Sequence, residues 1–483
     1  MKEVENKGTY WVMCRECLGR GKKRRKLSKK VRLNYQLACD QFETMKGEGN
    51  VPVRPKGHQY TCLHCNGSGL ILSNEPVIPD EEHYPHVAII GAGIGGIALA
   101  VACMHRGIPF TLYERDRDFS TRSQGYGLTL QQASKAISSL GILTLDEGVV
   151  STKHVVHTTA GEVIGEWGMR KWLSSDVEMV AKRSNVHIAR QSLRQALLQQ
   201  LGGNDRIKWA HQLVNFKQDE NGRAVLDFQV NGEIITSKAD LVVGADGIRS
   251  SVRKLLLGDD VNPLRYLDCM VILGICSLSA LNNITSTLLD GATVFQTANG
   301  NDRIYIMPYT SDSVMWQLSF PVSENEAKAL SLQGPQALKE EACRRTPWHD
   351  PIPQILAATE VDLISGYPVY DRALLEAGLM DNGKQVTLIG DAAHPMSPFK
   401  GQGANQALLD ALALARGISK GCGSSHWKKT GIRESVLMEY ESEMITRSAV
   451  KVKDSADAAK FLHSEMVLFE SDAPRGSCVK KIE

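Results

Sequence analysis

The chain has 483 residues, of which 42% are hydrophobic and 23% are charged, and its formal net charge is +2. This composition is typical of a soluble globular protein with two or three domains and excludes a fibrous or disordered chain. The nearly balanced charge gives no reason to expect a general affinity for polyanions.

The first 72 residues carry the basic character of the chain, with 15 lysines and arginines against 6 acidic residues. Most of the excess lies in KKRRKLSKKVR at 22–32. Such a run is either a solvated loop or a patch for nucleic acid or an anionic membrane. Aromatic residues do not interleave with these charges, so we favour the solvated loop and do not expect nucleic acid as a partner.

Four of the eleven cysteines repeat one unit, C-x-x-C-x-G-x-G, as CRECLGRG and CLHCNGSG. Two such knuckles predict one tetrahedral structural Zn²⁺ site, with glycines that let backbone N–H groups approach the sulfurs. The unit is similar to the cysteine-rich repeats of DnaJ-type chaperones. Two features count against it: a 44-residue gap separates the pairs, and four unrelated buried thiols would be the plainer interpretation. The expected ligands are Cys14, Cys17, Cys62 and Cys65.

The remaining features of this region concern its location and its role. The cysteines, with no N-terminal apolar segment, favour a reducing compartment, so we expect a cytoplasmic protein. The zinc module is a candidate site for a protein partner. Ser73–His83 is polar, contains two prolines and is interpreted as a linker.

A glycine turn follows the linker in the order strand, turn, helix. Pro85–Ile90 is apolar, the next residues read G-x-G-x-x-G, and an Ala-rich segment continues to about His105. A second strand, Phe110–Tyr113, ends at Glu114, where an acid would bond a ribose and repel a 2'-phosphate. The pattern predicts a Rossmann-like site for FAD or NAD, not NADP, with the diphosphate on a helix N-terminus. The residues expected there are Gly91, Gly93, Gly96, Glu114 and Arg115.

The same segment has a second interpretation, because Val87–Met104 contains no charged residue and has nearly the length of a membrane span. Its four closely spaced glycines, and the motifs that follow, argue against that interpretation. We therefore expect no membrane span.

Further along, ARQSLRQALLQQL at 189–201 has helical spacing, with Leu193, Ala196, Leu197 and Leu201 as its buried stripe. Strands are expected at Ile207–Phe216, Ala224–Val230 and Glu233–Thr236, joined by two Asn-Gly turns. Residues 258–370 alternate like strands and, with His154–Val180, should form a substrate sheet. Glu434–His463 is expected to be a long helix. Candidates for the pocket wall are His157, Tyr305, Trp316, Gln317 and Phe320, although such positions are more often plain core or solvent face.

GDAAHPMSPFKGQGAN at 390–405 follows a strand at Gln385–Ile389. It resembles, at every fixed position, the flavin-contacting motif of the class A flavoprotein aromatic hydroxylases, a family that includes para-hydroxybenzoate hydroxylase, salicylate hydroxylase and the tetracycline-inactivating monooxygenases. The resemblance spans about Pro85 to Asp457. It implies that the motif lies against the ring and ribityl chain of FAD. The residues carried over are Asp391, Pro398, Gly401, Gly403, Ala404 and Asn405.

The family's other motifs match as well. GADGIRSSVR at 244–253 implies contacts of Asp246 and Arg249 with FAD and the nicotinamide nucleotide, and Arg190 matches an arginine beside the flavin. For each aspartate, a helix N-cap is the plainer alternative. No side chain can be assigned as general acid or base, because His394 and Asp391 belong to the flavin scaffold.

The expected fold is α/β, with a Rossmann-like FAD-binding domain interleaved with a mixed β-sheet substrate domain, a small N-terminal zinc module and a long C-terminal helix. The expected divisions are a zinc module (1–72), a linker (73–84), FAD-binding parts (85–153, 184–257 and 371–430), substrate-domain parts (154–183 and 258–370) and a C-terminal helix and tail (431–483).

The resemblance implies an NAD(P)H- and O₂-dependent FAD monooxygenase that hydroxylates an aromatic or polyketide-like small molecule through a C4a-hydroperoxyflavin. Two alternatives stay open: a reductase or dehydrogenase of the same fold that does not activate oxygen, and an interaction protein whose zinc module docks to a partner.

Overall fold

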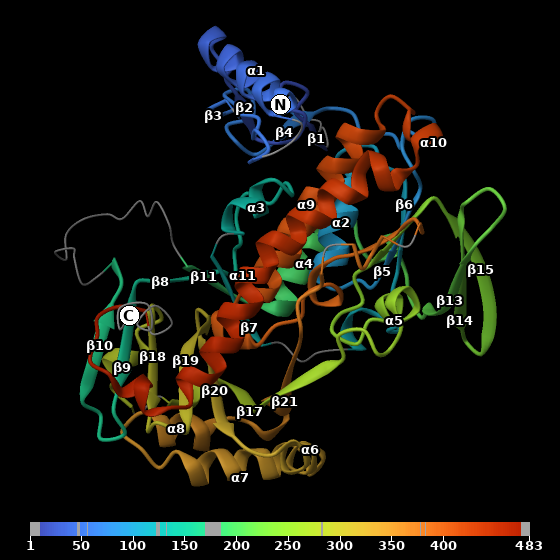
Figure 1. Cartoon of the computed structure of the whole chain (residues 1–483). Coiled ribbons are helices and arrows are strands. Elements are labelled where there is room, and N and C mark those ends of the chain that lie inside the picture. Colours follow the sequence, from blue (N-terminus) through green and yellow to red (C-terminus); the bar gives the residue numbers. More distant parts are fainter. Residues whose placement is uncertain are drawn as a thin grey trace, which may run out of the picture. The chain divides into compact units, whose positions relative to one another are not determined.

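The computed structural model describes residues 10–45, 49–55, 57–121, 126–131, 133–169, 185–281, 284–376, 378–381 and 383–474 (Figure 1). Two compact units divide the chain, Met1–Ile78 and Pro79–Glu483. The division between them falls inside the polar stretch before the glycine turn. The finer domain boundaries expected from the sequence stay predictions.

The first unit is built from two antiparallel strand pairs. β1 (Tyr10–Met13) pairs with β4 (Leu70–Ser73), and β2 (Lys22–Arg24) pairs with β3 (Gln59–Thr61). A helix of 16 residues, α1 (Lys29–Thr44), lies within the gap between the two cysteine pairs, and none of its residues is buried. The basic run is therefore solvent-exposed as expected, but it forms β2 and the start of α1 instead of a loop.

A parallel five-stranded sheet forms the centre of the second unit. Its order is β12 (Ile207–Lys208), β6 (Phe110–Tyr113), β5 (Val87–Ile90), β16 (Leu241–Gly244) and β22 (Val386–Leu388). The inner strands are fully buried, which is why their sequences are continuously apolar. Segments about 300 residues apart in sequence therefore end at the same edge of one sheet.

Helices pack around this sheet. α2 (Ile94–Met104) contacts both α4 (Arg190–Leu201) and α9 (Gly403–Cys422). The long C-terminal helix α11 (Met438–Leu462) follows a π-helical turn at Arg433–Leu437 and runs beside α9 (Figure 1). Shorter helices are α3 (Ser134–Ser138), α5 (Ser251–Leu257) and α10 (Trp427–Thr430). The buried side of α4 carries Arg194 and Leu198, whereas Ala196, expected in its stripe, is only partly buried.

A mixed seven-stranded sheet is the second large element of this unit. Its order is β10 (Val163–Trp167), β9 (Lys153–His157), β18 (Thr293–Ala298), β19 (Arg303–Thr310), β20 (Ser313–Pro321), β17 (Leu264–Ser277) and β21 (Ile364–Arg372). One face is covered by α6 (Glu324–Leu332), α7 (Pro335–Arg345) and α8 (Ile352–Ala358) (Figure 1). The alternating strand pattern did not predict these helices, although the Ser323–Glu326 capping box signals the first of them. The part of the expected strand region at 170–180 lies outside the described residues.

Two small antiparallel sheets complete the unit. One has the order β7 (Gly127–Leu130), β11 (Asn185–Ala189) and β8 (Val149–Ser151). The other is the expected meander, β13 (Gln212–Gln218), β14 (Ala224–Val230) and β15 (Glu233–Ala239). The single strand expected at Ile207–Phe216 is instead split, with a positive φ at Ala210 between β12 and β13.

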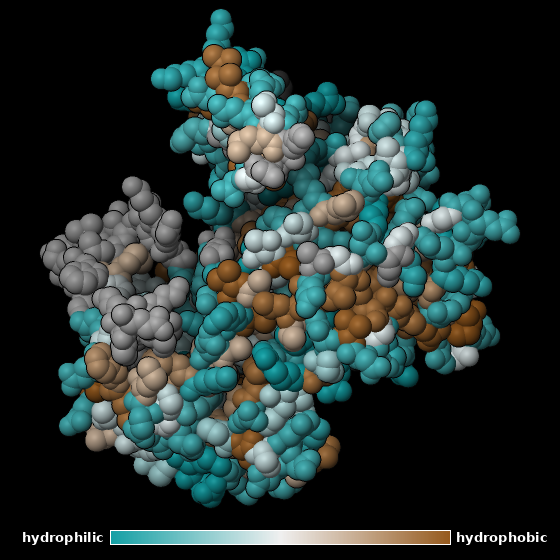
Figure 2. All heavy atoms as spheres, viewed as in Figure 1, coloured by the Kyte–Doolittle hydropathy of each residue, from teal (hydrophilic) through white to brown (hydrophobic). Residues whose placement is uncertain are grey.

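The predicted fold class is confirmed by these elements: a parallel-sheet α/β unit interleaved with a mixed sheet, a small cysteine-containing unit and a long C-terminal helix. Hydrophilic side chains cover most of the face visible in Figure 2, with apolar ones gathered across its middle. Among the described helices, none has both the length and the apolar character that crossing a bilayer requires.

Candidate functional site

A cavity of about 830 Å³ lies in the second unit, where the carboxyl ends of the parallel strands meet the open face of the mixed sheet. Its volume is within the range of cofactor and substrate pockets. Apart from histidines, the described residues with charged side chains on its wall are four basic residues and one carboxylate, namely Arg190, Arg249, Arg303, Lys400 and Asp391. The cavity is therefore suited to an anionic ligand.

Two helices start at this cavity without a side-chain cap. Gly93 is the N-cap residue of α2 and Gln402 that of α9, and neither helix has a side-chain hydrogen bond at its start. Gly93 and Gly403 both line the cavity although they are 310 residues apart in sequence. Uncapped N–H groups at a helix start bind phosphate and other electron-rich groups.

In the glycine turn before α2, backbone atoms pack closely against Gly91 and Gly96 but not against Gly93. A Cβ at Gly96 would lie 1.8 Å from the carbonyl oxygen of Gly91, and a Cβ at Gly91 would lie 2.6 Å from that of Ala245. A Cβ at Gly93 would meet only the Arg190 Nη2 atom, at 3.9 Å. Gly91 and Gly96 are therefore required by the close packing of the backbone, whereas Gly93 leaves room on the cavity side.

Glu114, at the end of β6, is buried against this turn. Its Oε2 atom accepts a 2.6 Å hydrogen bond from the Ala92 N–H group, and its Oε1 atom accepts one from Asp116 at 3.1 Å. Arg115 is exposed and is not part of the cavity wall. Contacts of either residue with a ribose or phosphate stay predictions.

The turn before α9 presents Pro398, Gly401, Gly403 and Ala404 to the cavity. Asn405 does not reach the wall. Its buried amide donates to the carbonyls of Thr129 and Gly401 and accepts from the backbone of Gln131 and Ala133. Any role of Asn405 toward a cofactor is therefore indirect, through the shape of the turn.

Arg190 and Asp391 face the cavity from α4 and from the end of β22. Arg190 begins its helix, and its guanidinium lies 5.7 Å from the centre of the Tyr126 ring. Asp391 is exposed to the cavity, but the surrounding protein desolvates its carboxyl. This burial raises the pKa of Asp391 against the opposing attraction of His394 and Arg190. The carboxyl is thus placed where hydroxyl groups of a ligand can bond to it.

Whereas the Asp391 carboxylate faces the cavity, that of Asp246 bonds to the protein itself. Its carboxylate accepts hydrogen bonds from the Ser250 hydroxyl and from the backbone of Ser251 and Val252 at the start of α5. Asp246 is not the helix N-cap itself, because Ser250 holds that position, but its contacts do serve the start of the helix. Its neighbours Ala245 and Gly247 line the cavity, as does Arg249.

A buried network lies behind the Gly390 turn. The Asp410 carboxylate of α9 lies 2.7 Å from the Nε2 atom of His394 and accepts 2.7 Å and 2.8 Å bonds from Arg447 and from the Gly390 backbone. Burial opposes charge on His394, but the attraction and hydrogen bond of Asp410 raise its pKa. The His394 Nδ1 atom is buried and has no hydrogen-bond partner among the described residues. Asp410 and Arg447 were not predicted from the sequence. The one feature that marks them there is a charged residue within an otherwise apolar stripe of a helix.

The open face of the mixed sheet forms the far wall of the cavity. Tyr305 and Gln317 are cross-strand partners and both line it. Trp316 and Phe320 point to the opposite face, into the core beneath α6–α8, and the expectation that they face the pocket is wrong. His157 is also buried away from the wall, against Phe295 and His349.

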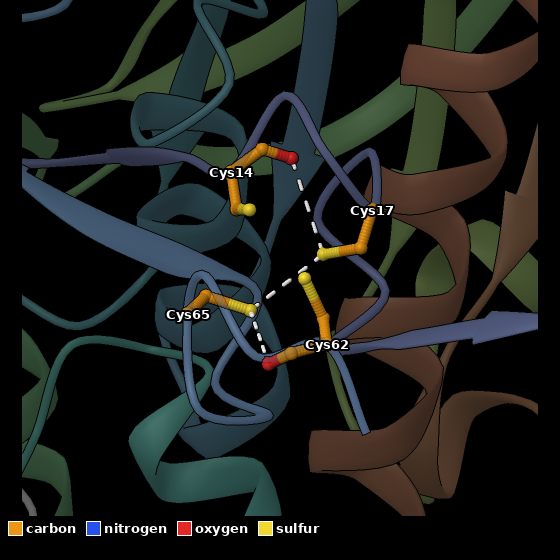
Figure 3. A group of neighbouring side chains, drawn as sticks. All are labelled: Cys14, Cys17, Cys62 and Cys65. Atoms are coloured by element: carbon orange, nitrogen blue, oxygen red, sulfur yellow. Dashed lines mark hydrogen bonds between the residues drawn. The ribbon is translucent and has the colours of Figure 1, made fainter. Parts of the chain in front are cut away.

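The four cysteines of the first unit converge (Figure 3). All are buried, and their sulfurs lie within 4.8 Å of one another. The Gly21 and Gly69 N–H groups each donate a 3.2 Å bond, to the Sγ atoms of Cys17 and Cys65. Four ligands at about 2.3 Å from a tetrahedral Zn²⁺ would be about 3.8 Å apart, and the Cys17–Cys65 sulfur separation is 3.7 Å. The thiol set therefore fits such an ion.

The comparisons with known proteins agree on one family. A family model described as "FAD binding domain" matches residues 84–422. Aurachin C monooxygenase/isomerase of Stigmatella aurantiaca is 30% identical over 345 residues, which are 69% of this chain and 80% of that protein. A probable FAD-dependent monooxygenase of Arthroderma benhamiae is 28% identical over 414 residues, 78% of this chain and 92% of that protein.

Solved structures share the fold at lower identity. The 2,6-dihydroxypyridine-3-hydroxylase from Arthrobacter nicotinovorans has a TM-score of 0.66 at 19% identity, over 81% of this chain and 96% of that chain. HpxO of Klebsiella pneumoniae, solved with FAD and uric acid, has a TM-score of 0.64 at 20% identity, over 79% and 89%.

Proposed function

The chain belongs to the FAD binding domain family and is an FAD-dependent monooxygenase, and from this premise we propose that it uses NAD(P)H and O₂ to hydroxylate an aromatic or polyketide-like small molecule. The observation that carries the proposal is that one cavity joins the two uncapped helix starts to the open face of the mixed sheet. A dinucleotide and a small substrate would then share one enclosed space.

The fit to FAD rests on particular residues. The space left at Gly93 and the free N–H groups of α2 would hold the diphosphate, with Arg190 beside it. Asp391 would bond the ribityl or ribose hydroxyls, and the Gly401–Ala404 turn would support the ring edge. Glu114 would bond the adenosine ribose from beneath the glycine turn.

When bound, FAD supplies hydride acceptance from a nicotinamide nucleotide and the activation of dioxygen. The chain orients the substrate and excludes water. The far wall is suited to both tasks, because it combines the aromatic side chains Tyr305 and Tyr367 with the apolar Met307 and Met315. No described side chain is proposed as a general base.

The decisive measurement is oxygen uptake by the purified protein with NADPH or NADH, with and without phenolic, indolic and polyketide compounds. Stimulation by a compound, with one oxygen atom recovered in the product, supports the monooxygenase. Nucleotide oxidation without oxygen consumption, with the two electrons recovered in a reduced form of the added compound, would support the alternative, a reductase of the same fold.

We also propose that Cys14, Cys17, Cys62 and Cys65 bind one structural Zn²⁺, and that this unit contacts a protein partner. A reducing, cytoplasmic location fits the cysteines, because those in the described residues are free thiols. Metal analysis of the purified protein tests the first of these proposals directly.

A further inference from the structure

The open face of the mixed sheet carries a buried guanidinium that pairs with no carboxylate of the described residues. Arg303 of β19 is 5% exposed and lines the cavity. Its Nε atom donates a 2.8 Å hydrogen bond to the amide oxygen of Gln296, and its guanidinium carbon lies 4.9 Å from the centre of the Tyr305 ring. Among the described residues, no carboxylate pairs with it. A buried charge is costly unless it is paired, and the described residues leave this guanidinium open to an anionic ligand in the cavity.

The nearest acidic residue in sequence is committed elsewhere. Asp302 precedes Arg303, and its carboxylate pairs with Arg345 of α7 at 3.1 Å. Asp302 lies just before β19 and is held by α7, whereas Arg303, the first residue of β19, faces the cavity.

Two described titratable groups near Arg303, Tyr305 and His463, are neutral at physiological pH. Burial raises the pKa of Tyr305 to about 12 and lowers that of His463 to about 4. Burial also lowers the pKa of Arg303 itself, to about 10, which leaves it protonated. The end of the cavity at β18 and β19 is therefore positive.

Gln296 adds a second donor at the same place. Its side chain is also only 5% exposed, and its oxygen accepts the bond from Arg303. Its Nε2 atom is buried and has no hydrogen-bond partner in the part of the chain that the structure describes. An unsatisfied buried amide is a cost that a ligand oxygen removes. Gln296 and Tyr305 are direct cross-strand partners, so donor and ring face the same space.

We propose that Arg303, supported by Gln296, selects substrates that carry an oxyanion, as a carboxylate or an ionised enol, on a planar ring system. A guanidinium binds two oxygens side by side, and the neighbouring aromatic side chains suit a flat molecule. The inference rests on the proposed function, because it takes this cavity as the place where the substrate binds. It assigns Arg303 to the substrate, whereas the diphosphate is assigned to α2 and Arg190.

The test uses the FAD-loaded full chain and two matched pairs of probes: salicylate with salicylamide, and 3-hydroxy-2-naphthoate with its amide. Each pair differs in charge and little in shape, and binding is followed by the change in flavin absorbance. We expect at least one acid to bind about tenfold or more tightly than its amide. Wild-type protein without any such preference, including one that binds none of the probes, overturns the proposal.

Two variants locate the preference. Gln296→Glu is nearly isosteric and gives Arg303 an internal counter-charge, so the preference for the acid should disappear while the fold is kept. Arg303→Lys keeps the charge but loses the two-oxygen geometry and should retain part of the preference, whereas Arg303→Gln should abolish it. Arg344→Gln, which removes an exposed charge of α7, is the control and should behave as wild type.

FAD content separates this inference from the function on which it rests. Wild-type protein that holds no FAD contradicts the proposed function. Protein that holds FAD and hydroxylates neutral compounds as well as acids leaves the function standing and rejects the role of Arg303. A preference that survives in both Gln296→Glu and Arg303→Gln also rejects it.

Discussion

Arg447 of α11 donates a 2.7 Å hydrogen bond to the buried carboxylate of Asp410 on α9. Asp410 also holds the Gly390 N–H group, directly before Asp391. The C-terminal helix is thereby linked to the turn that faces the proposed flavin site, although it contributes few side chains to the cavity wall. We therefore predict that substitutions of Arg447 in α11 change the affinity for the flavin through Asp410 and the Gly390 turn.

Arg447→Met should weaken FAD binding and destabilise the apoprotein by about 2 kcal/mol or more, because Asp410 loses one of its two charged partners in a buried site. Arg447 is partly exposed, so we expect a smaller loss of stability than for a fully buried ion pair. Chemical unfolding and FAD titration measure the two effects. Lys453→Met, at an exposed position of the same helix, is the control. Wild-type FAD affinity in Arg447→Met would reject the link.

His394→Gln should change how stability depends on pH. Asp410 raises the folded-state pKa of His394 above the unfolded value of about 6.5, so the protonated form is favoured by folding. The resulting stabilisation is complete below that unfolded value and is lost as the pH rises through the higher folded-state pKa. Unfolding free energy of the wild type should therefore fall over this window, by at most about 1.4 kcal/mol per pH unit, and the variant should show a smaller slope. Equal slopes would contradict the assignment.

Gly93→Ala and Gly96→Ala should separate cofactor binding from folding. The added methyl at Gly93 has room and acceptable backbone angles, so the apoprotein should keep its stability while FAD binds about tenfold or more weakly. At Gly96 the methyl would collide with the Gly91 carbonyl, and stability should fall by about 2 kcal/mol or more. Thermal unfolding of both apoproteins and FAD titration of Gly93→Ala give the comparison. Unchanged FAD affinity in Gly93→Ala would move the diphosphate away from this turn.

Asp391→Ala should loosen FAD by about 10- to 100-fold, since it removes a carboxylate that would bond ligand hydroxyls. Equilibrium dialysis or flavin fluorescence measures the affinity. Asp362→Ala, at an exposed site, controls for the loss of an acidic charge. Retention of wild-type affinity in Asp391→Ala would exclude the proposed contact.

Cys14→Ser and Cys65→Ser should each release the single Zn²⁺ expected in the wild-type chain, because each sulfur belongs to the buried cluster. Cys343→Ser, at an exposed position of α7, should keep it. Metal content is measured by mass spectrometry of the purified proteins, and FAD content should stay unchanged in all three. A metal-free wild type would remove the zinc proposal.

The local patterns of the chain were enough to determine several of its features. The glycine turn between β5 and α2, the meander with its Asn-Gly turns and the paired cysteine knuckles each depend on residues close in sequence. Backbone conformation at such places is restricted by the residue itself, as at Asn231 and Gly232, which both have positive φ. The family motif added the expectation that distant segments meet at one cofactor.

Only the tertiary structure decided which side chains face that site. Trp316 and Gln317 are neighbours in one strand, and the packing of α6–α8 beneath the sheet turned the tryptophan into the core and left the glutamine in the cavity. Asn405 and Asp246 belong to binding motifs, yet backbone groups brought near by folding occupy their polar atoms. That no carboxylate of the described residues pairs with Arg303 is likewise a property of its surroundings, because the neighbouring Asp302 pairs with Arg345 of α7. Such pairings depend on contacts between residues far apart in sequence, which no local pattern specifies.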